Sequence, residues 1–154
     1  MVAAAFAVAA LLGLFAVFSD AGEYALILGD AEGEGVFAEI AVRPGDNFSV
    51  TFVHSVNNSP VTDVYEVREP GIRLVETRYY AFGAGVPSEL EPGQSLSYAE
   101  DGAMVVSGID KEMRDLIYVV GTVSDHVMEI GGEEISLREL CGRNSAVRFS
   151  VARS

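Results

Sequence analysis

Short stretches with strand character, interrupted by glycine or proline about every ten residues, run from residue 24 to residue 151. The clearest alternation begins at Phe48 and places Val50 and Phe52 on the same face of an extended chain. The candidate strands are residues 24–28, 36–42, 48–56, 61–67, 72–80, 103–107, 116–120, 126–130 and 146–151, with helical turns expected at 110–116 and, after Ser136 as N-cap, at 136–140. This regular spacing of short strands and turns predicts a mainly β domain, an antiparallel sandwich or barrel of about eight to ten short strands.

An apolar segment precedes these strands, because residues 2–18 contain no charged or polar side chain. As a helix they would reach about 26 Å, slightly less than the roughly 30 Å hydrocarbon core of a bilayer. The segment is typical either of a signal peptide with a small-x-small cleavage site at residues 19–21, or of a helical membrane anchor. No lysine or arginine precedes it, which weakens the first interpretation, and a buried core helix is a third alternative. We predict a signal peptide or membrane anchor at residues 1–22 and a single β-rich domain at 23–154.

Charge limits the location and the partners of the domain. No basic residue follows the apolar segment before Arg43, which favours an extracytoplasmic position, anchored to the cell membrane or secreted. The net charge of -13 would repel nucleic acid, and no basic cluster could hold an anionic membrane surface. A large excess of acidic residues with a single lysine, Lys111, is typical of a halophilic protein. At 1 M salt, charges are screened over about 3 Å, so the acidic residues repel one another little. An ordinary acidic exported protein fits equally well.

The most distinctive loop is residues 54–63, which joins two well-patterned strands. Its asparagine and serine side chains suit a turn, and Pro60 cannot donate a ladder hydrogen bond. His54 ends the alternating strand on its apolar face. Its ring would either lock the turn through a hydrogen bond to a loop carbonyl, or line a pocket as a ligand-binding group, an acid–base group or a metal ligand.

Two further segments carry polar groups or glycines in suggestive positions. Residues 82–87 run from Phe82, the last of a group of aromatic residues, into a Gly-Ala-Gly-Val-Pro turn, where glycine permits positive φ or close backbone approach. This turn would either end a strand or offer a backbone surface to a ligand or partner. Asp125 and His126 form an adjacent pair, interpreted as a turn aspartate before a strand-start histidine, or as part of a site.

Catalysis and metal binding have little support in these residues. A Ser–His–acid site needs a serine beside a histidine, but His54 and Ser55 are neighbours on a strand and point to opposite faces. A zinc site needs about four ligands, and the chain has two histidines and one cysteine. We therefore predict no metal and no cofactor. Cys141 is expected to be a small buried apolar residue, and a single cysteine allows no internal disulfide.

A family resemblance rests on several of these segments. Residues 52–56, then Pro60-Val61, then 65–67 and the turn at 82–87, resemble a domain-of-unknown-function family of small bacterial and archaeal proteins. Its members begin with an apolar segment and are often encoded beside TRAP-type solute transporters of the TAXI class. The resemblance covers about residues 48–151, and the acidic surface is similar to a haloarchaeal version. It implies signature positions at His54, Ser55, Pro60, Glu66, Gly83, Gly85 and Pro87.

These observations favour an exported or membrane-anchored β-domain that binds TRAP-type transporter subunits or a small solute. The resemblance implies an accessory role in the uptake of organic anions or amino acids. The candidate binding residues are His54, Ser55, Pro60, Asp63, Glu66, Gly83, Gly85, Pro87, Asp125 and His126. We expect the loops at residues 54–63 and 82–87 to lie near each other. The alternatives are a small extracytoplasmic hydrolase that uses His54, and a structural envelope domain.

Overall fold

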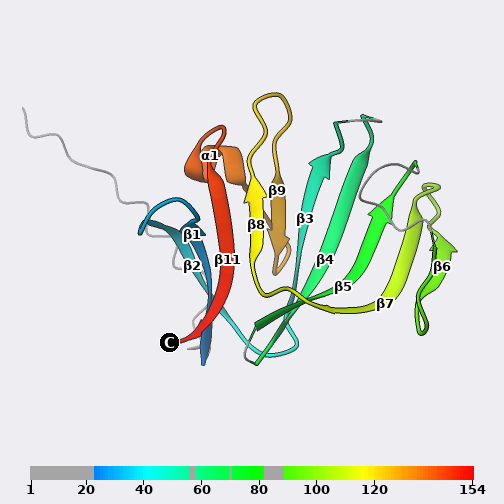
Figure 1. The fold of residues 1–154 in the computed structure, drawn as a ribbon, viewed down its shortest axis with the longest axis horizontal. Helices are drawn as coiled ribbons and strands as arrows, with labels where there is room; N and C mark the ends of the chain where they lie inside the picture. The colour runs from blue at the N-terminus through cyan, green and yellow to red at the C-terminus, as the bar shows by residue number, and fades with distance from the viewer. Residues whose placement is uncertain (1–22, 56–57, 70, 82–88) are drawn as a thin grey trace, which may run out of the picture.

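The computed structural model describes residues 23–55, 58–69, 71–81 and 89–154. They form two antiparallel sheets (Figure 1), a smaller one with strand order β2-β1-β11-β8 and a larger one with order β10-β9-β3-β4-β5-β7-β6. The elements are β1 (Tyr24–Asp30), β2 (Val36–Val42), β3 (Asn47–Val53), β4 (Pro60–Arg68), β5 (Gly71–Tyr79), β6 (Ser95–Tyr98), β7 (Met104–Glu112), β8 (Leu116–Val119), β9 (Val127–Ile130), β10 (Glu133–Ser136), α1 (Leu137–Cys141) and β11 (Ala146–Arg153).

The prediction of a mainly β fold of antiparallel strands is confirmed. The described residues form eleven strands, against the expected eight to ten or so. Two strands that the sequence pattern missed, β6 and β10, are four residues long and lie at opposite edges of the larger sheet. Four residues are too few for a distinct pattern: β6 alternates as Ser-Leu-Ser-Tyr with every residue exposed, and β10, Glu-Glu-Ile-Ser, does not alternate.

Most of the core lies between the two sheets. Phe48 of β3 stacks on Tyr65 of β4 and on Phe149 of β11, with ring centroids 5.1 and 5.7 Å away, so aromatic contacts join the sheets. The buried residues of this cluster are Tyr24, Leu26, Leu28, Val42, Phe48, Val50, Tyr65, Val67, Ile72, Leu116, Val120, Met128, Leu137, Val147 and Phe149. Most of them come from alternate positions of paired strands, as the period of two requires, whereas Val120 follows β8 and Leu137 begins α1.

A second, smaller cluster belongs to the larger sheet alone. It consists of Val61, Tyr79, Met104, Val106 and Ile109, with Phe52 and Leu74 packed against it. All seven residues lie on β3, β4, β5 or β7, and none on a strand of the smaller sheet. The larger sheet therefore extends past β8, the last strand of the smaller one (Figure 1).

The expected helical turn at residues 110–116 is wrong, because β7 continues through Glu112 and β8 begins at Leu116. The pairing of β5 with β7 shifts between Leu74 and Glu76, because β7 has extra residues there that form a bulge. Beyond the bulge the two strands pair again. Gly108 lies in this bulge with a φ of +77°, a conformation that glycine adopts without strain.

The other expected helical turn, at residues 136–140, is confirmed as α1. The Ser136 side chain caps it by accepting a hydrogen bond of 3.0 Å from the Glu139 amide. Cys141 ends the helix half-buried, with its Sγ 2.8 Å from the Leu137 carbonyl oxygen, and burial raises the pKa of its thiol. Cys141 was expected to be buried, whereas it is half-buried and packs against the edge of the core.

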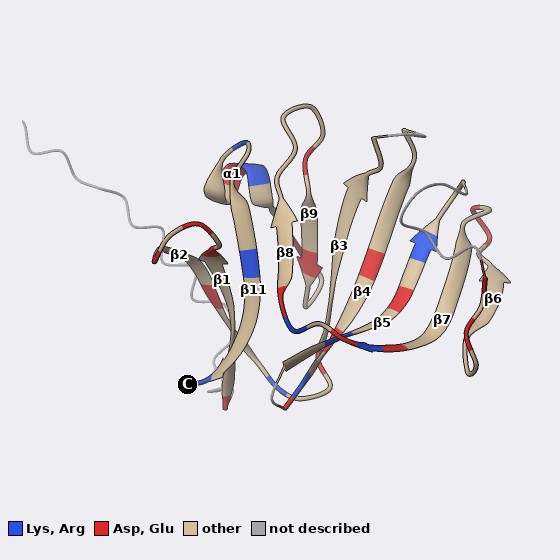
Figure 2. Cartoon of the chain, in the orientation of Figure 1, with Lys and Arg blue, Asp and Glu red and all other residues tan. Residues whose placement is uncertain are grey.

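Acidic residues are spread over the strands and loops, with arginines interspersed among them (Figure 2). In the described residues, six arginines form ion pairs: Arg68 with Glu66 and Asp110, Arg73 with Asp110, Arg78 with Glu76, Arg114 with Glu112, Arg148 with Asp115, and Arg153 with Glu69. Positive charge is thus neutralised locally, and the excess acid carries the net charge of -13.

The predicted N-terminal apolar helix, whether signal peptide or anchor, lies outside the described residues, as do residues 82–88. Within the described ranges, no helix has the length and apolar character needed to cross a membrane.

Gly108 tests the bulge in β7. A Cβ atom on residue 108 would lie 2.4 Å from the Gly93 carbonyl oxygen. Gly108→Ala should lower the free energy of unfolding by about 2–4 kcal/mol, because left-handed strain of about 1–2 kcal/mol adds to the displacement of the Gly93 backbone. Chemical denaturation measures this loss. Gly132→Ala is the control, since Gly132 has a φ of +83° but no atom within 4 Å of its would-be Cβ. Equal losses in the two variants would show that the contact with Gly93 does not constrain the bulge.

Candidate functional site

A carboxylate lies on the inner face of β4, among residues that build the core. Val61, Asp63, Tyr65 and Val67 alternate along the strand and share this face, and the three neighbours of Asp63 in that row are buried. Asp63 itself is half-buried. An aspartate at such a position interrupts the apolar pattern, and buried polar groups need hydrogen-bond partners.

Hydroxyl groups supply those partners. Thr77 of β5 donates to Asp63 Oδ1 at 2.5 Å, and Tyr118 of β8 donates to Asp63 Oδ2 at 3.2 Å. The Tyr65 hydroxyl lies 2.6 Å from the Tyr118 hydroxyl and 3.5 Å from Asp63 Oδ2. Since Tyr118 donates to the carboxylate, it accepts from Tyr65 at the shorter contact. We call these four residues, Asp63, Tyr65, Thr77 and Tyr118, the Asp63 cluster.

The Asp63 cluster contains a charge without a charged partner. No arginine or lysine of the described residues forms an ion pair with Asp63. Burial raises the pKa of the Asp63 carboxyl, and the hydrogen bonds from Thr77, Tyr118 and Tyr65 oppose that rise without cancelling it. Burial also raises the pKa of both tyrosines, with the Asp63 charge adding to it, so both hydroxyls keep their protons and stay donors.

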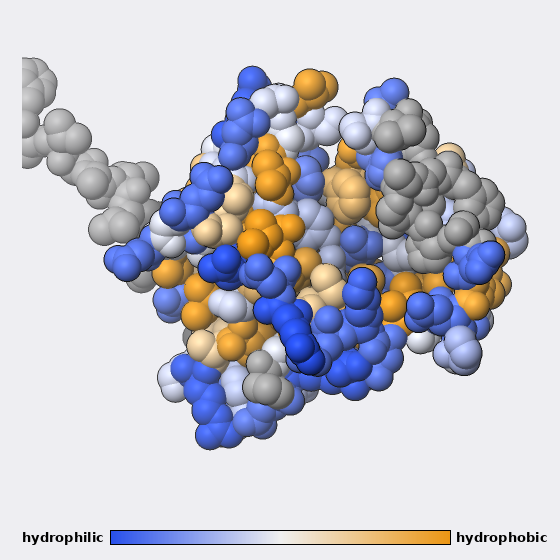
Figure 3. Space-filling model, viewed as in Figure 1, coloured by the Kyte–Doolittle hydropathy of each residue, from blue (hydrophilic) through white to orange (hydrophobic). Residues whose placement is uncertain are grey.

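Three aromatic rings adjoin the Asp63 cluster. Phe52 of β3 stacks on His126 at 5.5 Å between ring centroids, and Tyr118 meets Phe52 at 5.8 Å and His126 at 5.6 Å. All three side chains are half-buried, so part of each ring reaches solvent. We call Phe52, Tyr118 and His126 the ring wall. In Figure 3 this face of the molecule is hollowed beside β8, over β3 and β4.

His126 contributes to the ring wall as a neutral imidazole. Burial lowers the pKa of its ring, although Asp125 opposes the shift. The Gly121 amide lies 3.4 Å from Nδ1 and points its hydrogen at it, so Nδ1 is the acceptor and the proton sits on Nε2. The histidine therefore adds an aromatic face without adding positive charge.

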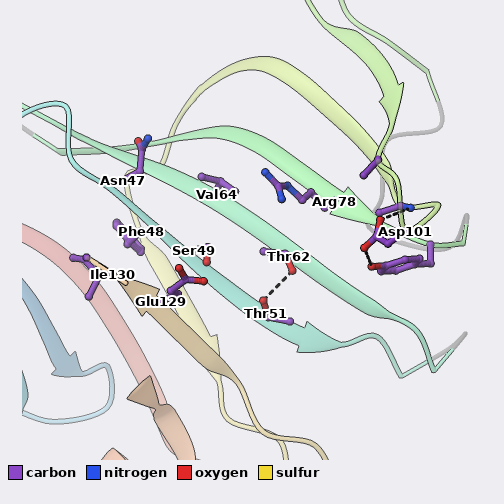
Figure 4. Close-up of a pocket in the computed structure, with 14 residues that line it drawn as sticks. Asn47, Phe48, Ser49, Thr51, Thr62, Val64, Arg78, Asp101, Glu129 and Ile130 are labelled. Atoms are coloured by element: carbon purple, nitrogen blue, oxygen red, sulfur yellow. Dashed lines mark hydrogen bonds between the residues drawn. The ribbon is translucent and has the colours of Figure 1, made fainter. Parts of the chain in front are cut away.

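A second concave surface lies on the outer face of the larger sheet (Figure 4). It encloses about 460 Å³, and its floor carries Ser49, Thr51, Thr62 and Val64. Its polar groups mostly satisfy one another. Thr51 and Thr62 share a hydrogen bond of 2.8 Å, Arg78 pairs with Glu76 at 2.6 Å, and Tyr80 donates to Asp101 at 2.5 Å.

The hairpin that follows β3 contains three of the residues that the sequence singled out. The His54 amide donates to the Ser59 carbonyl at 2.9 Å, and the His54 carbonyl accepts from the Asn58 amide at 2.9 Å. The backbone of His54 thereby closes the turn. Ser55 is exposed in that turn, and Pro60 is the first residue of β4, a position where a missing N–H is tolerated.

The remaining predicted residues lie apart from each other. Glu66 points to the outer face of β4 and pairs with Arg68 at 2.6 Å. Asp125 holds α1, because its carboxylate accepts from the Ser136 hydroxyl and, at 3.0 Å, from the Arg138 amide. Gly83, Gly85 and Pro87 lie outside the described residues, so their expected proximity to the loop at residues 54–63 remains a prediction.

Asp63 and His126 are the two predicted residues that the structure brings to one place, through their shared neighbour Tyr118. Sequence reasoning missed Phe52, Tyr65, Thr77 and Tyr118 as site residues. The alternation of β4 did place Asp63 in a row with Val61, Tyr65 and Val67, and an acid in a core-facing row was the available signal. Across the described residues, no group of three or more histidine, cysteine or acidic side chains could hold a metal ion.

Stability against pH tests the electrostatics of Asp63. Its folded-state pKa is raised, so its contribution to stability is present at acid pH and is lost as the pH rises through that value. Asp63→Asn removes the buried charge, which should raise the free energy of unfolding at about pH 7 by about 1 kcal/mol. The unfolding midpoint of the variant should then lie a few degrees above that of the wild-type protein. The difference should shrink as the pH falls toward 4 or so. Calorimetry across this range measures it, with the exposed Glu39→Gln as control. A lower midpoint for Asp63→Asn at neutral pH would mean that the hydroxyl donors outweigh burial.

Comparison with known proteins gives one match. The family model for a domain of unknown function, DUF1850, matches residues 48–137, more than half of the chain. This span includes every residue of the Asp63 cluster and the ring wall, and it agrees with the resemblance to an uncharacterised family. No curated protein and no solved structure matches the chain. The chain belongs to the DUF1850 family of domains of unknown function.

Proposed function

We propose that this chain is an extracytoplasmic binding domain, exported or anchored through residues 1–22, that holds a small solute at the Asp63 cluster and serves a TRAP-type transporter. The observation that carries the binding role is the half-buried Asp63 carboxylate, which has hydroxyl partners and, among the described residues, no arginine or lysine paired with it. A buried charge is unfavourable unless something compensates it. A solute that reaches the hollow beside β8 supplies that compensation.

The geometry of the cluster favours binding over chemistry. The two tyrosine hydroxyls have raised pKa values and act as donors, not as bases. Asp125 could orient His126 in an acid–base pair, but its carboxylate is occupied by the N-terminal end of α1. The His126 ring is used for stacking on Phe52. Fixed donors beside an apolar ring surface are typical of small-molecule sites.

The transporter partnership and the location have separate support. The resemblance of residues 48–151 to proteins encoded beside TAXI-type TRAP transporters supports the partner. Residues 2–18 are uncharged, and the residues between them and Arg43 include acidic side chains but no basic one. This pattern supports export or anchoring. A domain held at the membrane surface beside a transporter would raise the local concentration of its solute.

Purification from native membranes tests the partnership. The full chain carrying a C-terminal affinity tag is extracted in mild detergent at the salt concentration of the host, and the eluate is analysed by mass spectrometry. Transporter subunits and the peptide covering residues 2–18 should both be recovered. A chain that elutes alone and begins near Gly22 would contradict the anchored partnership.

Growth tests the role of Asp63 in uptake. In cells that lack the gene, the wild-type chain and Glu39→Gln should restore growth on the transported solute, screened among amino acids and other amines as carbon or nitrogen sources. Asp63→Asn should restore it poorly, with uptake at least about tenfold slower, because the variant lacks the charge that holds the solute. Full restoration by Asp63→Asn would remove the Asp63 cluster from the proposal.

A further inference from the structure

We infer that the solute held at the Asp63 cluster is an organic cation that presents a primary ammonium group to Asp63 and a short apolar chain to the ring wall. The inference rests on the proposed binding role and gives it a ligand class. It combines the carboxylate, the hydroxyl donors around it, and the three rings beside it.

The carboxylate selects for a donor. An ionised aspartate only accepts hydrogen bonds, and each of its two oxygens has more than one lone pair. Thr77 occupies one position on Oδ1, Tyr118 occupies one on Oδ2, and the Tyr65 hydroxyl lies at a longer 3.5 Å from Oδ2. The remaining lone pairs can accept hydrogen bonds from N–H groups. A primary ammonium has three N–H donors, whereas a quaternary ammonium has none.

Charge excludes the opposite class of ligand. A carboxylate or phosphate placed against Asp63 would meet a like charge with no arginine or lysine of the described residues paired there to neutralise it. A cation at the same place offsets the burial that disfavours the ionised carboxyl. The net charge of -13 adds a long-range field that attracts cations and repels anions.

The ring wall suits the rest of such a ligand. Aromatic faces attract an ammonium group and its polarised neighbouring CH₂ groups. Phe52 and Tyr118 are uncharged rings, and His126 stays neutral because burial lowers the pKa of its imidazole. A protonated histidine would repel a cation, so the neutral tautomer matters for this ligand class. High salt weakens the long-range attraction but leaves contacts of a few ångströms largely intact.

Three probes of equal length and different charge test the inference: butylammonium, butanol and butyrate. Each is titrated into the isotopically labelled chain, and binding is followed by the NMR signals of Phe52, Tyr118 and His126. Butylammonium should shift these signals in a saturable manner, and butanol and butyrate should bind at least about tenfold more weakly. Tetramethylammonium, which has no N–H group, should also bind more weakly than butylammonium.

Two substitutions locate the site. Asp63→Asn should weaken butylammonium binding by about tenfold or more, and Phe52→Leu, which keeps an apolar side chain but removes a ring face, should weaken it several-fold. Glu39→Gln, on β2 at the edge of the smaller sheet opposite β8, should bind as the wild-type chain does. The amide spectrum of each variant shows whether it is folded. Unchanged affinity in folded Asp63→Asn would overturn the inference.

The outcomes separate the ligand class from the binding role. If butanol or butyrate binds as tightly as butylammonium and shifts the same ring signals, the solute site is supported but the assignment of a cationic ligand is wrong. If no probe shifts the signals of the ring wall, both the cation and the solute site at Asp63 are wrong. The transporter partnership is then still decided by the membrane purification, which does not depend on the ligand.

Discussion

The hydroxyl contact between Tyr65 and Tyr118 joins the two sheets at the line where the smaller sheet ends. Tyr118 lies on β8, the edge strand, and its oxygen is 2.6 Å from that of Tyr65 on β4. On one side of this contact lies the core shared by both sheets, and on the other side lies the cluster formed by the larger sheet alone. The same contact positions the Tyr118 hydroxyl toward Asp63. Sheet packing and site geometry therefore depend on one pair of tyrosines.

The strand pattern predicted the fold class because each core strand buries alternate side chains. Phe48 and Val50 point inward as their spacing requires, and Ser136 caps α1 as its position before an apolar residue suggested. Residues 110–116 misled the prediction for a physical reason. The bulge at Gly108 depends on the approach of the Gly93 carbonyl, a contact made by the folded chain that leaves no local pattern. The edge strand β6 is only four residues long and neither of its faces is buried, so its pattern was too short to be recognised.

The site was predictable only in part, because its residues come from four strands and a loop. Asp63 and His126 stood out as polar residues in or beside apolar stretches. Tyr118 did not, since it is 55 residues from Asp63 and meets it only when β8 folds over β4. Sequence adjacency was also a poor guide. Asp125 and His126 are neighbours, yet the carboxylate holds α1 and the ring stacks on Phe52.

The charge of Asp63 needs an explanation beyond the fold. If the cluster served only to fasten the sheets, an asparagine could accept from one hydroxyl through Oδ1 and donate to the other through Nδ2, without placing a charge in the interior. A valine in that row would extend the apolar face of β4 from Val61 to Tyr65. Groups that lower stability and remain in place are typical of functional sites. A ligand with an ammonium group relieves the burial of the carboxylate, so its binding would also stabilise the folded domain. The free-energy cost of burying the Asp63 charge and the proposed preference for a cation thus have the same cause.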